Sequence, residues 1–403
     1  MKTLGSTLWL VTLALSTAVA HALPPLQLFV DLTPAGGVLR PPAGNYSGPV
    51  VISKPLTLEG SGGVTVDNGG KGTVLTVRAD GTTIKGLKLI NSGDSHNGLD
   101  AGLLLEANGT LIEENMIENT LFGIVLNQGN NNTIRNNKIG SRGDTPSLRG
   151  DGLRLWYSQH NRIEENTIDR VRDLVFTNSS DNIVEGNLIR ESRIGMEFVF
   201  SPNNRVINNR ISRNLSGIVN LYSDHNLIKG NRIEQMRGAT HSALAIKESF
   251  KVRIEDNQVI HCGVGLTANT PTHRENILYL TGNRLSYNDV AMYFYGERGG
   301  HVIHGNRFEG NLLHVAVSAP SSARDNDWRG NYWDDYEGFD PDGDGVGNTP
   351  HEIYLYADRI WMDRPMTSFF RSSPMLEIVD FIERLAPFSK PEMIVMDPAP
   401  ATR

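Results

Sequence analysis

Apolar and polar residues follow one repeating phrase through most of the chain. Examples are "HNRIEENTI" (160–168), "NNRVINNRI" (203–211) and "HNLIKGNRI" (225–233). The second Asn of the phrase recurs at intervals of 21 to 29 residues, with an apolar residue two positions after it. It stands at Asn115, Asn137, Asn166, Asn187, Asn209, Asn231, Asn257, Asn283, Asn306 and Asn331. A period of this length is typical of a solenoid, in which each unit stacks on the next.

The apolar residues within each unit alternate with polar ones in short runs rich in Ile and Val. A second short run follows a Gly, as in "GIVL" (123–126), "GLRLW" (152–156) and "GMEFVF" (195–200). This alternation predicts short strands separated by Asn and Gly turns. We therefore predict an all-β fold, a right-handed parallel β-helix of about ten to twelve coils with inward Ile and Val as its core. The longest interval contains "GSRGDTPSLRG" (140–150), where we expect a loop to bulge from the coil.

The repeated Asn is expected at the bend between two strands. Asn tolerates left-handed backbone geometry, and its amide can bond the same residue in the neighbouring coils. Strands in neighbouring coils lie about 4.8 Å apart, which brings these amides within reach of each other. The pattern predicts a structural ladder of asparagines along the solenoid.

The two ends of the chain depart from the repeat. Residues 1–22 have Lys2, an apolar run and an Ala20-x-Ala22 ending, which predicts a cleaved secretory signal rather than a membrane anchor. We assign 23–348 to the β-helix, with a strand-built N-terminal cap and a C-terminal acidic loop. Residues 349–403 form a C-terminal extension with a short helix. No segment after the signal is apolar enough to predict a transmembrane span.

Charge argues against nucleic-acid binding, and the cysteine content excludes an internal disulfide. The formal net charge is −7, from 38 basic and 45 acidic residues, and no basic block is present. Such a chain is a poor nucleic-acid binder. Cys262 is the single cysteine, so no internal disulfide can form.

The acidic loop "DPDGDGVGN" (340–348) matches part of a calcium-binding loop. Asp340, Asp342, Asp344, the Val346 carbonyl and Asn348 occupy positions 1, 3, 5, 7 and 9, with Gly345 at the sixth. The twelfth position is His351 instead of an acid. The alternative is an Asp/Gly turn held by side-chain to backbone hydrogen bonds.

Copper(I) favours Met, Cys and His ligands, and one group of these residues shares a register. Met236 and Cys262 each stand five residues after a repeat Asn, so they are expected one coil apart. His261 adjoins Cys262, and His241 lies in a nearby insertion. The alternative is a buried cysteine and a surface methionine without a metal. His301, His304 and His314 form a looser set, because their offsets differ.

The tail contains an amphipathic helix. Ser373-Pro374 is a good N-cap and first helical position, and Pro387 ends the pattern. The apolar stripe consists of Met375, Ile378, Phe381, Ile382 and Leu385. The stripe either caps the solenoid or docks on a partner, and we favour docking because methionines are concentrated in the tail.

The segment "GNYWDDYEGFDPDGDGVGNTP" followed by "EIYLYADRIWMDRPM" resembles the NosD family. The resemblance covers essentially the whole chain; the repeat itself is less specific and is shared with β-helical sugar-binding and sugar-hydrolysing domains. It implies a periplasmic protein that works with an ABC permease and its ATPase in copper-site assembly of nitrous oxide reductase. It further implies a copper-donating chaperone as partner and copper as ligand.

Two other functions compete with this non-enzymatic role. Many β-helices are polysaccharide lyases, hydrolases or epimerases, and some are structural adhesins. An enzyme of this kind needs clustered carboxylates aligned along one face. The middle coils carry no tight Asp-x-Asp or Asp-Asp pair, although Asp151 and Asp173 begin strand runs that could line a groove.

Overall fold

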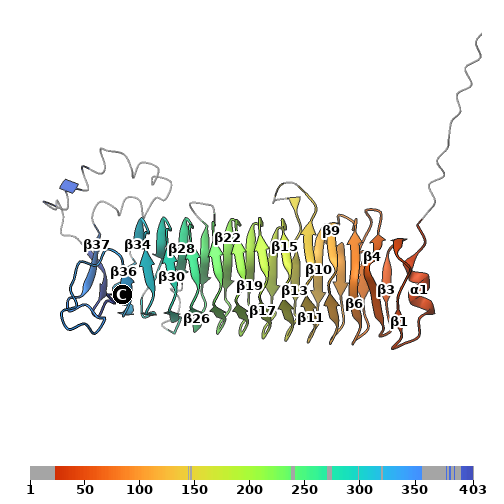
Figure 1. The fold of residues 1–403 in the computed structure, drawn as a ribbon, viewed down its shortest axis with the longest axis horizontal. Helices are drawn as coiled ribbons and strands as arrows, with labels where there is room; N and C mark the ends of the chain where they lie inside the picture. The colour runs from red at the N-terminus through yellow and green to blue at the C-terminus, as the bar shows by residue number, and fades with distance from the viewer. Residues whose placement is uncertain are drawn as a thin grey trace, which may run out of the picture.

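The computed structural model describes residues 23–402, except 144, 146–147, 237–240, 270–274, 298, 319–320, 356–377, 379–380, 383–384 and 386–391. The predicted signal (1–22) lies outside the described residues. The described chain winds into an elongated parallel β-helix whose strands run across its long axis (Figure 1). The sheets contain twelve and 24 strands, which corresponds to three short strands for most of the coils. The predicted fold is confirmed.

The twelve-stranded sheet contributes one strand to each coil, and every neighbouring pair is parallel. Its strands are β3 (Val50–Ile52), β5 (Leu75–Val77), β7 (Ala101–Leu105), β10 (Phe122–Asn127), β13 (Leu153–Trp156), β16 (Asp173–Thr177), β19 (Ile194–Val199), β22 (Ser216–Leu221), β25 (Ser242–Lys247), β28 (Val264–Asn269), β31 (Val290–Phe294) and β34 (Leu313–Val317).

The 24-stranded sheet forms two columns that meet at the repeat Asn. The first column is β1 (Val38–Leu39), β4 (Thr57–Asp67), β6 (Thr83–Ile90), β8 (Leu111–Glu113), β11 (Thr133–Arg135), β14 (Arg162–Glu164), β17 (Ile183–Glu185), β20 (Arg205–Ile207), β23 (Leu227–Lys229), β26 (Val252–Glu255), β29 (Leu278–Thr281), β32 (Val302–His304) and β35 (Asp327–Arg329). The second shares β4 and β6 and continues with β2 (Gly44–Ser47), β9 (Met116–Thr120), β12 (Lys138–Ser141), β15 (Thr167–Asp169), β18 (Leu188–Arg190), β21 (Arg210–Ser212), β24 (Arg232–Glu234), β27 (Gln258–Ile260), β30 (Arg284–Ser286), β33 (Arg307–Glu309) and β36 (Tyr332–Trp333).

The core consists of inward columns of aliphatic side chains that stack in register. Ile163 pairs with Ile134 and Val184, and Ile168 pairs with Ile139 and Ile189. These side chains are at most 2% exposed. Each fully buried aliphatic side chain contributes roughly 1.5–3 kcal/mol, so the stacked columns supply the main stabilisation of the solenoid. The columns end on Trp328 and Trp333.

The predicted asparagine ladder is present. From Asn137 to Asn331, each Asn Oδ1 accepts the backbone N–H of the Asn in the preceding coil, at 2.9 to 3.0 Å. In the coil before Asn115, Leu87 of β6 occupies the ladder position. Asn115 Oδ1 therefore accepts the Leu87 N–H, at 3.0 Å. The last rung is not an Asn: Asp397 Oδ2 accepts from both the N–H and Nδ2 of Asn331.

One detail of the predicted corner is wrong. The ladder asparagines do not take positive φ; the residue before each one does, as at Asn208 (54°) and Glu165 (54°). The preceding residue reverses the chain, which leaves the Asn side chain free to point along the solenoid axis. A second ladder, formed by the first Asn of the phrase, follows another corner and includes Asn161 and Asn182.

The ends are closed by different elements. The N-terminal cap contains a helix that the sequence pattern did not predict, α1 (Leu26–Leu32), whose Leu26 and Val30 are buried against the first coils. At the other end, β37 (His351–Leu355) and β38 (Glu392–Asp397) pair antiparallel. Residues after β38 bond to the last coil, since Ala401 N–H donates to the Asn331 carbonyl at 2.9 Å and the Ala399 carbonyl accepts from Gly330.

Candidate functional site

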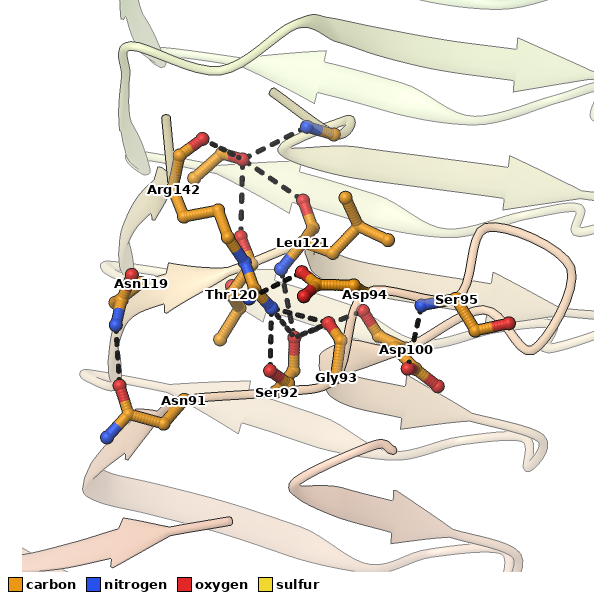
Figure 2. Close-up of polar contacts among 12 residues, drawn as sticks. Asn91, Ser92, Gly93, Asp94, Ser95, Asp100, Asn119, Thr120, Leu121 and Arg142 are labelled. Atoms are coloured by element: carbon orange, nitrogen blue, oxygen red, sulfur yellow. Dashed lines mark hydrogen bonds and ion pairs between the residues drawn. The ribbon is translucent and has the colours of Figure 1, made fainter. Parts of the chain in front are cut away.

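The loop around 140–150 is tied to an earlier loop by Arg142. Figure 2 shows its guanidinium directed at the segment from Ser92 to Asp94. Arg142 donates to the Ser92 carbonyl at 2.6 Å and lies 2.6 Å from Asp94 Oδ1. The Ser92 hydroxyl accepts the Leu121 N–H, so the network joins three coils. These contacts give Arg142 a structural role at the base of the loop.

One face of the solenoid concentrates paired charges that the sequence indicated only weakly. Asp151 is fully buried and lies 2.8 Å from Arg172, and Asp173 is buried and paired with Arg193. Burial raises the pKa of Asp151, although Arg172 and Arg154 act against this. Burial, and then Asp173, also raise the pKa of the neighbouring Glu197. Asp151 and Asp173, which the sequence suggested might line a groove, therefore both form ion pairs with arginines.

The acidic loop adopts a tight turn in which its three aspartates converge. The carboxylates of Asp340, Asp342 and Asp344 offer oxygens within 4.8 Å of one another. Asp340 also accepts the N–H groups of Gly343 at 2.7 Å, Asp344 at 3.1 Å and Gly345 at 3.0 Å. The pKa of Asp340 is lowered: burial acts to raise it, but the hydrogen bonds from the Gly345 and Gly343 N–H groups hold it below its usual value.

This loop combines both interpretations of its sequence. The backbone bonds of Asp340 form the expected Asp/Gly turn, and they also point three carboxylates at one place, as a hard oxygen-preferring cation requires. Val346 forms a bridge with Ala401, and Asn348 N–H donates to the Phe339 carbonyl at 3.0 Å. The calcium-like assignment of Asp340, Asp342, Asp344, Val346 and Asn348 stays a prediction.

The copper candidates do not converge. Met236 and Cys262 occupy matching positions of adjacent coils, and both side chains lie in the hydrophobic core. His261 points outward, where its ring stacks on Tyr287 at 5.3 Å. Burial raises the pKa of Cys262 to about 11, which keeps it a thiol at neutral pH. A copper site needs a thiolate and converging ligands, so the described geometry of this set does not fit the ion.

The corner after β27 explains this outcome. β27 ends at Ile260, and His261 takes a positive φ of 56° at the corner that follows, so its side chain is exposed while Cys262 lies in the core. His241 is half-buried and precedes β25. Cys262 belongs to neither of the groups of His, Cys, Asp and Glu that the described residues bring within 4.8 Å.

The looser histidine set is dispersed, and one member joins a group that the sequence did not reveal. His301 is buried against Glu297 at 3.2 Å, and His304 lies 3.0 Å from Asp327. His314 contacts Asp334 and Asp335, which precede the acidic loop. A fourth residue, His351, lies 3.5 Å from Asp335.

Asp335 and His351 both have shifted pKa values. The pKa of Asp335 is lowered: burial acts to raise it, but His314 and His351 hold it below the usual range. Burial lowers the pKa of His351, against the pull of the Asp335 charge. At neutral pH the carboxylate is therefore ionised and the His351 ring is neutral.

The predicted docking helix lies mostly outside the described residues, including Met375. Four of its five apolar positions are described and helical. Ile378, Phe381, Ile382 and Leu385 are 58%, 62%, 43% and 70% exposed. These positions are not packed into the solenoid core. Among the residues that the structure describes, no helix has the length and apolar character to cross a membrane.

Two family models match the chain. Residues 139–338 match the family described as "Periplasmic copper-binding protein (NosD)", and residues 73–193 match "Right handed beta helix region". A relative from Pseudomonas aeruginosa, described as "Probable ABC transporter binding protein NosD", is 29% identical over 95% of this chain and 92% of its own. A relative of the same description from Stutzerimonas stutzeri is 27% identical over 94% and 90%.

Solved structures share the fold at low identity. The A-module of the Azotobacter vinelandii mannuronan C-5 epimerase AlgE6 superposes with a TM-score of 0.57 at 12% identity, covering 75% of this chain and 93% of that one. A tailspike protein of E. coli bacteriophage HK620, in complex with a hexasaccharide, gives 0.52 at 12% identity, covering 77% and 61%. At this identity the likeness establishes a β-helix and nothing about substrate.

Proposed function

Because the chain belongs to the NosD family of periplasmic proteins, we propose that it is the exported accessory subunit of an ABC permease and its ATPase. In this role it serves copper-site assembly of nitrous oxide reductase, with copper as cargo that a donor chaperone delivers. The match to ABC transporter binding proteins along 95% of the chain carries the proposal.

The exposed tail supports the partnership. Ile378, Phe381, Ile382 and Leu385 recur at helical spacing and are all at least 43% exposed. An amphipathic helix with an exposed apolar face is a common docking element, since it buries that face in a groove of its partner. We assign the permease as this partner.

Co-purification tests the assignment. Phe381→Asp combined with Ile382→Asp should leave the melting temperature of the isolated chain unchanged, because both side chains are exposed, and should abolish capture of the permease and ATPase. The matched control is Phe200→Asp with Tyr222→Asp, a stacked pair on the solenoid surface that is 54% and 49% exposed. The control should retain capture. A full complex carrying both tail substitutions would contradict docking through the helix.

A polysaccharide-modifying enzyme is the second candidate, and Glu197 is the observation that favours it. Its carboxyl is partly buried and has a raised pKa beside Arg193, as an acid–base group requires. The test is turnover of uronate polymers by the purified chain and by Glu197→Gln. Turnover that disappears in this variant would establish the enzyme. Copper-deficient reductase in cells lacking this protein, without polymer turnover, would establish the accessory role.

A further inference from the structure

His314 occupies a position that the fold otherwise reserves for small residues. In the coils before it, the paired positions are Gly217, Ala243, Gly265 and Ala291. The corner is crowded: a Cβ added at Gly217 would lie 2.2 Å from the Ala243 carbonyl, and one at Gly265 would lie 2.6 Å from that of Ala291. An imidazole at this position in β34, the last strand of the column, is therefore not a requirement of the repeat.

The ligand atoms of His314, Asp334 and Asp335 lie within 4.8 Å of one another, and His351 adjoins this group through Asp335. Its Nε2 lies 2.9 Å from Asp334 Oδ1 and 3.3 Å from Asp335 Oδ1, and His351 Nε2 lies 3.5 Å from the same Asp335 oxygen. Ligands held about 2.0–2.1 Å from a tetrahedral ion are separated by about 3.3–3.4 Å. The four groups come from β34, the turn directly after β36 and the start of β37.

His351 supplies an independent indication. Its side chain is 8% exposed, and its buried Nε2 makes no hydrogen bond within the described residues beyond the 3.5 Å ion-pair contact with Asp335 Oδ1. Trp333 stacks on this ring at 4.8 Å and also contacts the His314 ring at 5.7 Å. A buried nitrogen with only this long contact lacks a full hydrogen bond, which costs free energy, and a bound ion would remove that cost.

We propose that His314, Asp335 and His351, with Asp334 as the fourth ligand, bind one divalent transition-metal ion of the Zn²⁺ type. Two imidazoles and two carboxylates suit a borderline divalent ion, whereas copper(I) prefers sulfur, which this set lacks. Asp335 and His351 also line an open hollow of about 520 Å³ next to the ligands, which gives the ion a route from solvent.

Such an ion would join the last coil to the C-terminal pair of strands. His314 belongs to the solenoid, and His351 opens β37. The tail segment 356–391 connects β37 to β38 in the chain, so the ion fixes one of the two strands from which the tail departs. This inference does not depend on the proposed transporter partnership.

Metal titration of the full exported chain tests the site. After chelator treatment and dialysis, calorimetry with Zn²⁺ should show one site, and His314→Gln, His351→Gln and Asp335→Asn should each weaken it at least tenfold. The matched control is His304→Gln, because His304 forms a simple His–Asp pair with Asp327. Asp342→Asn separates this site from the acidic loop. Both controls should bind Zn²⁺ as the wild type does.

X-ray absorption on Zn²⁺-loaded wild-type chain keeps the test independent of variant folding. The spectrum should contain the scattering of two imidazoles and no sulfur neighbour near about 2.3 Å. Titrations with Cu²⁺ and Cu⁺ should show the divalent ion competing at the same site and the monovalent ion not competing. Absence of a stoichiometric site, binding unchanged by His351→Gln, or a sulfur neighbour would overturn the proposal.

Discussion

Removing one rung of the asparagine ladder tests how the corners of the solenoid are held. Asn209 is 1% exposed and lies in the middle of the ladder. Its Oδ1 accepts the N–H and Nδ2 of Asn187, both at 2.9 Å, and its Nδ2 donates to the Val184 carbonyl at 2.8 Å. Its Nδ2 also donates to the Ile207 carbonyl and to Asn231 Oδ1, both at 3.0 Å. Asn209→Ala removes all five bonds and leaves the buried Asn187 N–H without an acceptor.

The expected cost follows from the groups left behind. Asn187 Nδ2 keeps the Ile163 and Glu185 carbonyls, and Asn231 keeps the backbone N–H of residue 209. The Asn187 N–H is thus the main unsatisfied group, and a buried donor without a partner costs roughly 1–3 kcal/mol. We expect Asn209→Ala to lower the free energy of unfolding by about that amount.

Two measurements check this magnitude. Denaturant unfolding followed by circular dichroism should give a lower midpoint than wild type, while Asn45→Ala, at an exposed position of β2, should not. Hydrogen exchange should accelerate about 10- to 100-fold in the coils around 182–210, since each 1.4 kcal/mol is tenfold. An unchanged midpoint, or acceleration spread evenly along the solenoid, would refute the ladder as a local stabilising element.

Three further predictions concern other sites. Calcium chelation should lower the melting temperature of the wild type and of Glu337→Ala, and Asp342→Ala should abolish that response; a chelation-insensitive wild type would leave the loop as a turn alone. Cys262, with a pKa of about 11, should be alkylated by iodoacetamide at pH 8 at least a hundredfold more slowly in the folded chain than in guanidinium, and rapid labelling when folded would contradict its burial. The pKa of Glu113 lies below 4.5 in the folded chain: burial opposes this shift, but Lys85 and Arg135 outweigh it. The ionised carboxylate therefore stabilises the fold above pH 4.5, and this stabilisation is lost as the pH falls through the lower folded pKa. Glu113→Gln should flatten the acid side of the plot of unfolding free energy against pH, and an unchanged acid side would exclude this contribution.

Periodicity made the solenoid predictable, because an inward apolar residue and a corner Asn must recur in every coil. The same logic located the stack of Met236 on Cys262, yet it could not decide whether side chains converge, since that depends on which way each residue faces. The helix α1 escaped notice because it is one short element without a repeat. The His314 group combines residues up to 37 positions apart, from 314 to 351. The one sequence feature that indicated it was a His in a register of Gly and Ala.

The rung that Asp397 supplies has a consequence for self-association. Every coil offers its open side to the next, so the last one would present a row of unpaired backbone groups, as any exposed strand edge does. Asp397, Ala399 and Ala401 occupy part of that row, because they bond Asn331 and Gly330. A chain cut before β38 would lose these contacts. The exposed strand edges of its last coil could then pair with another chain in the way that neighbouring coils pair with each other. The residues 397–401 thus cover part of this edge and oppose end-to-end association of the β-helix.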